Sequence, residues 1–384
     1  MMYIMSILCD ESICTGCKAC VAVCPKSAIC VQDNITNMIP VIDTNLCINC
    51  GACVNVCQVQ TPDQLQSPIS WYQGWISDEK SRAKSSSGGF AYGIMKAFIS
   101  NGGTVCSCLL RNGRFIYAVA KTIEELDAFR GSKYVKSDLA DVYTTVRNIM
   151  MEDNKLLFVG LPCHVAAIKK YIGKKYESKL YTIDLICHGS PSPIVLEKYL
   201  RERKIKIYDV ENIYFRQKGI FGLRVKRKPM NREKADISIT PTGVRDRYSI
   251  GFLNGLFYTE NCYRCRYAGL KRISDITIGD AWGSDMNGLE EGKRGISLAL
   301  CQTKKGEDLL LNCDLNLYPT NIENEIQANH QLQKPSEKPQ QRALFFHLLD
   351  RGKSIHTAVT RCYPKVCIRQ DIKAVLFKLH VLKL

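Results

Sequence analysis

The order of apolar and polar positions along the chain predicts an α/β protein. From Trp71 to about Asp350, short runs rich in branched apolar residues alternate with longer stretches whose apolar positions recur at helical spacing. Strands are predicted over 155–160, 180–186 and 273–279, and helices over 88–100, 165–171 and 194–204. Strands that alternate with helices in this way are typical of mixed α/β domains.

The two ends of the chain depart from this pattern. Residues 9–57 are dense in cysteine and contain an internal repeat, and the following segment to Ser70 holds Gln, Pro and Ser without periodicity. We therefore predict a small α+β domain over 1–60, a linker over 61–70, a larger mixed α/β domain over 71–350 and a tail over 351–384.

The tail carries apolar positions at helical spacing from Ile368 to Leu384, interrupted by Lys373, Lys378 and Lys383. This pattern is typical of an amphipathic helix. Such a helix more commonly packs on its own domain, but a basic one could also make a peripheral contact with a membrane or a partner.

Length and composition narrow the class of protein. A chain of 384 residues exceeds one typical core, so two or three domains are expected. No apolar run approaches the ~20 residues that cross a bilayer, and the N-terminus shows no secretory signal. We therefore expect a cytoplasmic protein, in which the twenty cysteines are metal ligands more often than disulfides.

Two cysteine runs have the ligand spacing of 4Fe-4S clusters. They are Cys14-x2-Cys17-x2-Cys20-x3-Cys24-Pro25 and Cys47-x2-Cys50-x2-Cys53-x3-Cys57. This is the bacterial ferredoxin run, in which the fourth Cys binds the other cluster. Cluster one is thus expected to use Cys14, Cys17, Cys20 and Cys57, and cluster two Cys47, Cys50, Cys53 and Cys24.

Details of the repeat support this interpretation. Gly16 and Gly51 ease the tight backbone around each cluster. Gln58 stands where a second Pro is usual, but that Pro is not a ligand. Two tandem runs of four fit zinc sites poorly, because these pair one CxxC with a distant second pair. Cys9 and Cys30 lie outside both sets and are predicted to be buried thiols, not ligands.

The formal net charge of +16 favours anionic partners. Three clusters of about −2 each would reduce it to roughly +10. Phosphorylated cofactors, acidic redox proteins and acidic lipid remain as partners, whereas no recognised motif supports nucleic acid. The basic stretch from Arg216 to Arg247 is predicted to be a solvated hairpin face, and it could dock an acidic donor.

Beyond residue 70 the sequence resembles the coenzyme F-420 hydrogenase/dehydrogenase beta-subunit family. The stretches that carry the resemblance, in order, are SSSGGF at 85–90, GSKYV at 131–135, GLPC at 160–163, CHG at 187–189, CxxC at 262–265 and DITIGDAWG at 275–283. The resemblance covers about residues 71–285. It implies an oxidoreductase that binds FAD and a 4Fe-4S cluster. Relatives that act on chlorophyll precursors or occur in sugar-polymer loci show that the family does not fix the substrate.

The resemblance also implies a flavin site. Its predicted contacts are Ser86, Ser87, Gly88, Gly89, Ser132, Lys133, Tyr134 and Asp280. On the residues alone, Ser and Gly at a helix start suit a phosphate but also serve as simple caps. Arg130 and Lys133 could hold a diphosphate in a turn. Asp280 could anchor a ribityl or ribose hydroxyl, and Trp282 could cover a flavin or cluster edge, or the pair could simply end a strand.

Four further cysteines, Cys163, Cys187, Cys262 and Cys265, could hold a third 4Fe-4S cluster. The first two follow predicted strands, where α/β folds place their sites. A zinc site, or buried thiols plus one redox pair, are the alternatives. His164 and His188 adjoin these cysteines and could tune a cluster, relay protons or be structural.

The sequence alone leaves two functions open. The first is a flavin-dependent iron–sulfur oxidoreductase, fed by ferredoxin or another redox protein and acting on a small redox substrate. The second is a non-catalytic electron-transfer subunit of a larger redox complex. A zinc-binding module is a third option. The sequence identifies no residue as a catalytic acid or base.

Overall fold

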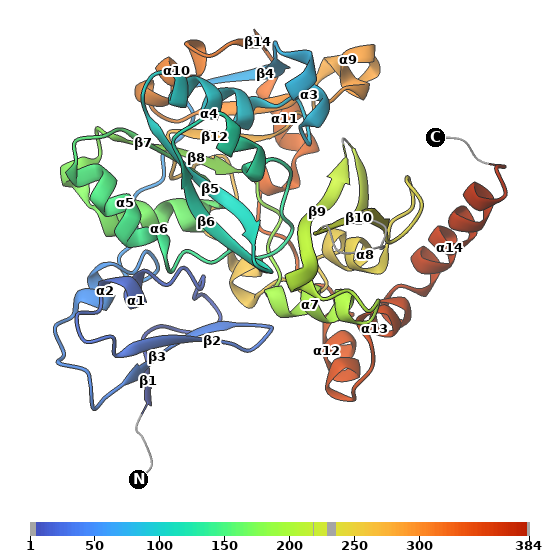
Figure 1. Ribbon diagram of the computed structural model, residues 1–384, viewed down its shortest axis with the longest axis horizontal. Coiled ribbons are helices and arrows are strands. Elements are labelled where there is room, and N and C mark those ends of the chain that lie inside the picture. Colours follow the sequence, from blue (N-terminus) through green and yellow to red (C-terminus); the bar gives the residue numbers. More distant parts are fainter. Residues whose placement is uncertain (1–4, 218, 229–235, 382–384) are drawn as a thin grey trace.

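The computed structural model describes residues 5–217, 219–228 and 236–381. The N-terminal part forms a small three-stranded antiparallel sheet of strand order β1-β3-β2, with two short helices beside it (Figure 1). Its elements are β1 (Met5–Ile7), α1 (Ala19–Val23), β2 (Ile29–Asp33), β3 (Met38–Asp43) and α2 (Ala52–Asn55).

An eight-stranded mixed sheet is the centre of the molecule, with strand order β14-β4-β13-β12-β8-β7-β5-β6. The inner strands β12, β8, β7 and β5 run parallel, and the remaining pairs are antiparallel. The strands are β4 (Ser70–Ile76), β5 (Thr104–Arg111), β6 (Arg114–Ala120), β7 (Leu156–Gly160), β8 (Leu180–Leu185), β12 (Ile276–Asp280), β13 (Ser297–Cys301) and β14 (Leu315–Tyr318).

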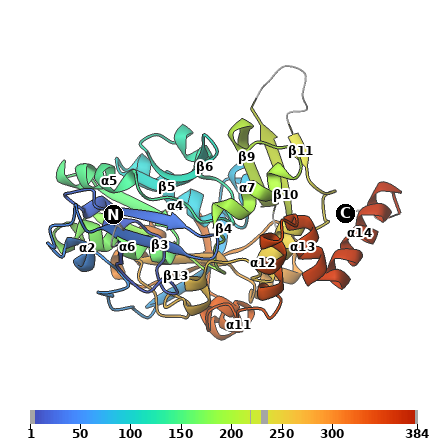
Figure 2. The same cartoon turned by 90° about the horizontal axis from the view of Figure 1, so that it is seen from below.

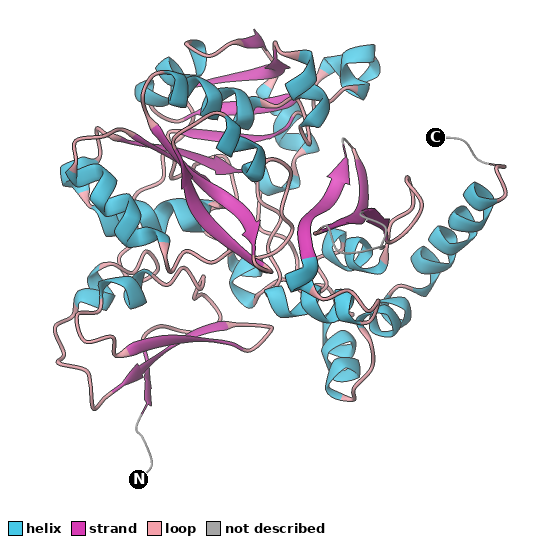
Figure 3. Ribbon diagram, in the orientation of Figure 1, coloured by secondary structure: helices cyan, strands magenta, loops and turns pink. Residues whose placement is uncertain are grey.

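Helices cover both faces of this sheet (Figure 3). Strand β7 shows why, because all five of its residues are buried, as expected for a parallel strand between two layers. Leu157 packs with the layer of α4 and α10, and Leu156 with that of α5 and α6. The helices are α3 (Glu79–Lys84), α4 (Phe90–Ser100), α5 (Val142–Met151), α6 (Pro162–Ile172), α9 (Glu290–Lys293), α10 (Lys304–Leu311) and α11 (Ile322–Ala328).

A further part of the structure lies beside the eight-stranded sheet and includes the C-terminal helices (Figures 1 and 2). It contains an antiparallel sheet of order β11-β10-β9 and a cluster of helices around one core. Its elements are α7 (Pro193–Arg201), β9 (Val210–Gln217), β10 (Ile220–Arg227), β11 (Asp236–Ser238), α8 (Arg247–Leu253), α12 (Arg342–Asp350), α13 (Ile355–Cys362) and α14 (Pro364–Lys378).

The N-terminal part docks on the α5–α6 layer. Ala19 of α1 and Val56 are buried in the same core as these helices. Polar bonds add to this contact, since Lys18 forms an ion pair with Asp138 at 2.7 Å and the Tyr143 hydroxyl donates to the Cys17 carbonyl at 2.8 Å. The cysteine-rich region is therefore joined to the sheet domain by apolar packing and by hydrogen bonds.

The tail divides into two parts. Helix α13 and the start of α14 are buried against α8, with Val359 and Cys367 inaccessible to solvent. Farther along, α14 extends away from the molecule (Figure 1), and Ile368, Ile372 and Val375 are exposed. The end of the predicted tail helix, 382–384, and part of the predicted basic stretch, 229–235, lie outside the described residues. Within the described part, no helix is long and apolar enough to span a membrane.

These elements agree with most of the expected ones. The mixed α/β fold is confirmed, and the predicted strand over 155–160 and helix over 88–100 correspond to β7 and α4. The predicted strand over 273–279 begins later, at Ile276, because Ile273 and Ser274 belong to the preceding turn, where Arg272 pairs with Gln66.

Candidate functional site

The four cysteines predicted for cluster one line a single cavity. Cys14 and Cys17 come from the loop that leads into α1, Cys20 lies in α1, and Cys57 follows α2. Gly16 permits the tight turn, because its φ is +67° and a Cβ there would lie 2.6 Å from Met38. Burial raises the pKa of Cys17 to about 11 and also raises that of Cys20. Thiols of this kind become thiolates when a metal binds them.

Cys9 lines the same cavity and is buried, as predicted. Hydrogen bonds with the Cys14 and Cys57 thiols raise its pKa. The cavity therefore has a fifth sulfur. Cys30 lies on strand β2 and is exposed, so the prediction of a buried thiol is wrong for this residue.

The residues predicted for cluster two lie closer to solvent. Cys50 is exposed and Cys47 is half-buried in the loop before α2, which turns at Gly51 with a φ of +72°, and Cys53 is half-buried within α2. Burial raises the pKa of Cys53, with contributions from Cys47 and Cys50. Cys24 accepts a hydrogen bond from the Ala28 N–H, and none joins it to the other three in the described part of the chain.

The four remaining candidate ligands line a second cavity, of about 240 Å³. Cys163 lies at the start of α6 just after β7, Cys187 follows β8, and Cys262 and Cys265 come from a turn about a hundred residues away. Burial raises the pKa of Cys163, and burial together with Cys262 and Cys265 raises that of Cys187 to about 12. The fold thus gathers four thiols from three separate segments.

This donor set fits an iron–sulfur cluster better than a single ion. A zinc ion would need its sulfurs about 2.3 Å away around one point. Among the described residues, no three His, Cys, Asp or Glu side chains lie close enough together to hold one ion. A cubane is wider than an ion and is held by four thiolates that stand farther apart.

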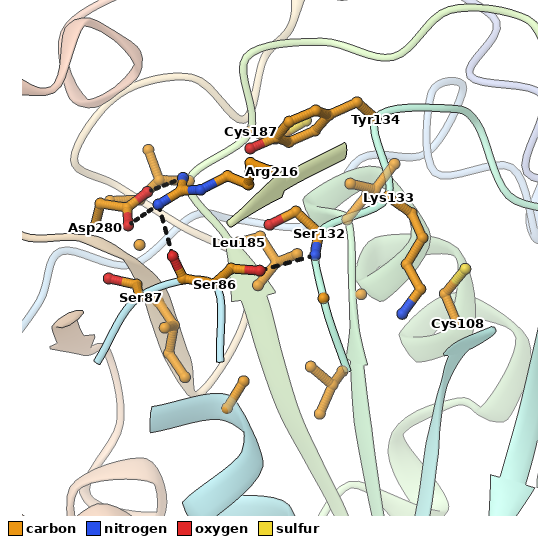
Figure 4. A pocket seen from close by; sticks show the side chains of 18 of the residues that line it. Ser86, Ser87, Cys108, Ser132, Lys133, Tyr134, Leu185, Cys187, Arg216 and Asp280 are labelled. Atoms are coloured by element: carbon orange, nitrogen blue, oxygen red, sulfur yellow. Dashed lines mark hydrogen bonds and ion pairs between the residues drawn. The ribbon is translucent and has the colours of Figure 1, made fainter. Parts of the chain in front are cut away.

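A third and larger cavity, of about 420 Å³, lies at the carboxyl ends of β7, β8 and β12 (Figure 4). Its size and its mixed apolar and polar lining are those of a small-molecule site. All the predicted flavin contacts except Gly88 line it. Gly88 instead packs on backbone, since a Cβ there would lie 2.4 Å from the Gly74 carbonyl oxygen.

Two predicted phosphate-binding loops meet in this cavity. The Ser132 N–H donates to the Ser86 hydroxyl at 3.1 Å, which joins the loop before α4 to the loop at 130–133 (Figure 4). Gly89, with a φ of +92°, begins α4. The first-turn N–H groups of this eleven-residue helix carry the positive end of its dipole, which suits an anion.

An ion pair between Arg216 and Asp280 forms part of the lining of the same cavity. The guanidinium donates to the two carboxylate oxygens at 2.7 and 2.8 Å, and to the Ser86 carbonyl at 2.9 Å. Arg216 and Arg247 are both buried, so the expectation that the stretch between them is a solvated face is wrong for its two end residues. Strand β9 turns the Arg216 side chain inward toward β12.

Aromatic and basic side chains complete the lining. The Tyr134 ring stacks on Phe252 with centroids 4.4 Å apart. Burial lowers the pKa of Lys133 to about 8, although its ammonium donates to the Phe129 and Arg130 carbonyls. Trp282 also lines the cavity and remains partly exposed.

The three cavities adjoin one another. Thr15 and Val59 line both the cavity of cluster one and that of the second cysteine set. Cys187 and His188 line both the latter cavity and the large one. His188 therefore stands between thiols and the large cavity, and burial lowers its pKa. His164 differs, because it is fully buried against the Tyr117 hydroxyl at 3.0 Å, and burial lowers its pKa to about 3.

Comparison with known protein families agrees with this geometry. Residues 13–61 match the family model of the 4Fe-4S dicluster domain, and residues 153–321 match that of the C terminus of the coenzyme F420 hydrogenase/dehydrogenase beta subunit. The first match indicates that residues 13–61 form a domain with two 4Fe-4S clusters. The second confirms the resemblance to the coenzyme F-420 hydrogenase/dehydrogenase beta-subunit family that the sequence predicted.

Two individual proteins are also similar. The F subunit of the F(420)H(2) dehydrogenase of Methanosarcina mazei is 25% identical over 234 residues, which are 56% of this chain and 65% of the relative. The chain thus spans just under two thirds of that relative's length. A chain in the structure of the F420-reducing [NiFe] hydrogenase complex from Methanosarcina barkeri aligns with a TM-score of 0.47 and 16% identity, over 70% of this chain and 90% of that chain.

Proposed function

We propose that the protein is an iron–sulfur flavoprotein oxidoreductase that passes electrons between 4Fe-4S clusters and a small molecule through FAD. The observation that carries this proposal is the row of three adjoining cavities. Two of them are lined by four predicted thiolate ligands each, and the third has the size and lining of a cofactor site. Redox centres in neighbouring cavities would form one continuous electron path.

The middle of this path is a proposed third cluster on Cys163, Cys187, Cys262 and Cys265. All four cysteines line the second cavity, and Cys187 also lines the large one. A cluster here would stand between cluster one and the large cavity. Without it, the path would have a gap that contains only protein.

The large cavity is the proposed FAD site. FAD, when bound, exchanges single electrons with clusters and a hydride with substrates. The α4 N-terminus and the Ser86 and Ser132 loops are placed to bind a diphosphate. Tyr134 offers an aromatic wall for a flat ring, and His188 separates that ring from the third cluster.

The outer end of the path is the loop of cluster two. Three apolar side chains on and beside this loop, Leu46, Ile48 and Val54, are exposed together with Cys50. An apolar patch around a cluster near the surface is suited to brief contact with a ferredoxin or another redox protein. We place the entry of electrons from such a partner here.

The acceptor is a coenzyme F-420-type compound or another reducible small molecule. The M. mazei relative is named for F420H2, and this supports the first of these. The same relative is named as one subunit among others, which supports the alternative that this chain transfers electrons within a larger redox complex and leaves the substrate chemistry to a partner. Turnover of a small acceptor by the isolated chain distinguishes the two.

Cofactor analysis of anaerobically purified protein tests the proposal. Three clusters predict about 12 irons per chain (3 × 4) and two predict about 8 (2 × 4), each with an equal amount of acid-labile sulfide. We expect the higher value together with one extractable FAD. Protein that contains zinc, or that holds iron but no flavin after reconstitution with FAD, would overturn the proposal.

A further inference from the structure

Lys136 is a buried cation between two of the cavities. Its side chain is only 3% exposed. The ammonium donates to the Thr15 carbonyl at 3.0 Å and to the Asn261 amide oxygen at 3.3 Å. Thr15 lies within the first ligand run, directly after Cys14, and Asn261 directly precedes Cys262. One lysine therefore bridges the loop of cluster one and the loop of the proposed third cluster.

In the part of the chain that the structure describes, no carboxylate pairs with this lysine. Within 5–217, 219–228 and 236–381, no Asp or Glu carboxylate lies within ion-pair distance of its ammonium, and both of its acceptors are neutral. The nearby carboxylate of Asp138 is engaged by Lys18 and Arg114 instead. Burial of an ammonium without a counter-charge is costly, so such groups in proteins pair with anions.

The groups that could balance this charge are the clusters themselves. A 4Fe-4S core with four thiolates carries about −2 when oxidised, and one-electron reduction takes it to about −3. A fixed positive charge stabilises the more negative state more strongly, because the interaction scales with the product of the charges. The cavities on each side of Lys136 are those lined by the two cysteine sets.

We propose that Lys136 is a shared counter-cation that raises the reduction potentials of cluster one and of the third cluster together. This inference rests on the proposed function, because it requires both clusters. Lys136 is thus a positioning residue, because it binds both ligand loops. It also favours the reduced state of cluster one and of the third cluster, which we call the two inner clusters. Cys47, Cys50 and Cys53 of cluster two line neither of these cavities, so we expect the potential of cluster two to change least.

Potentiometric titration of the anaerobic holoprotein, followed by electron paramagnetic resonance, tests this inference. For Lys136→Gln we expect the reduced-to-oxidised ratio of both inner clusters at a fixed potential to fall about tenfold, a shift of ~59 mV to lower potential for each one-electron couple. Lys136→Arg retains the charge and should stay near the wild-type potentials. Lys305→Gln is the control, since this lysine also donates to a backbone carbonyl but lies outside the three cavities.

A second variant keeps the test informative if Lys136→Gln does not load iron. Asn261→Asp places a carboxylate beside the ammonium and should also lower both inner potentials. The inference is overturned if iron-loaded variants keep wild-type potentials, or if Lys136→Arg shifts them as far as Lys136→Gln does. Failure of the proposed function is distinguishable, because the wild-type titration would then contain no third cluster signal.

Discussion

The guanidinium of Arg216 binds both carboxylate oxygens of Asp280, 64 residues away, and both side chains line the cavity of about 420 Å³. Asp280 therefore has a structural role besides its predicted contact with a ribityl or ribose hydroxyl. It supplies the counter-charge that holds Arg216 against the Ser86 carbonyl, and so fixes the loop that precedes α4. We infer that the pair shapes the proposed flavin site.

Asp280→Asn should weaken flavin binding and the fold together. It leaves Arg216 buried without a full counter-charge, and breaking a fully buried pair costs about 3–5 kcal/mol. Because Asp280 is partly exposed, we expect a smaller loss of unfolding free energy, roughly 2 kcal/mol. Chemical denaturation and titration with FAD measure the two effects. In the exposed pair Arg201–Glu197, Arg201→Gln should change stability by less than about 0.5 kcal/mol. Equal losses for the two variants would contradict this role.

FAD affinity should fall as the pH rises through 8. Burial lowers the pKa of Lys133 to about 8, so in the free protein this side chain loses its charge above that pH. An anionic diphosphate favours the charged form and raises this pKa, so binding takes up a proton at higher pH and is weakened there. Lys133→Met should abolish this pH dependence, which flavin fluorescence titrations at a series of pH values would measure. An unchanged pH profile in the variant would place the diphosphate away from Lys133.

Gln58 should prove to be a structural link between the two parts of the chain. It is buried, its amide donates to the Thr15 hydroxyl at 2.8 Å, and it accepts a hydrogen bond from the Tyr267 hydroxyl. Gln58→Leu leaves two buried hydroxyls without this partner, at about 1–3 kcal/mol each. We expect a lower denaturation midpoint and faster bleaching of cluster one in air. Gln60→Leu is the control, because the Gln60 side chain is exposed and donates to the Leu8 carbonyl.

A charge in the apolar patch at cluster two should slow electron entry from a protein donor. Ile48 is 56% exposed beside Cys47 and Cys50, so Ile48→Asp can be accommodated without disturbing a core. We expect kcat/KM for reduced ferredoxin to fall about tenfold, the effect of about 1.4 kcal/mol at a contact, while reduction by dithionite stays unchanged. Leu344→Asp, on the distant helix α12, should leave both rates at wild-type values. A loss shared by both donors would show damage to the cluster instead of the contact.

Local patterns in the sequence predicted much of this structure. The ligand runs are local, so their spacing alone indicates two clusters, and buried strands such as β7 are evident as apolar runs. Arg216 was misread because nothing near it in the sequence shows that β9 would turn it toward Asp280. Lys136 and Gln58 were missed as bridging residues for the same reason, since their partners lie 121 and 43 residues away. The one available signal was Gln58 itself, which stands where Pro is usual.

The most direct test of the electron path is rapid mixing with reduced ferredoxin, comparing the holoprotein with a Cys262→Ala/Cys265→Ala variant reconstituted with FAD. The variant removes two thiols of the proposed middle cluster and leaves both N-terminal ligand runs intact. We predict that its N-terminal clusters still become reduced while flavin reduction slows at least about a hundredfold, a barrier increase of about 2.7 kcal/mol. Flavin reduction at the wild-type rate would contradict the path through Cys163, Cys187, Cys262 and Cys265.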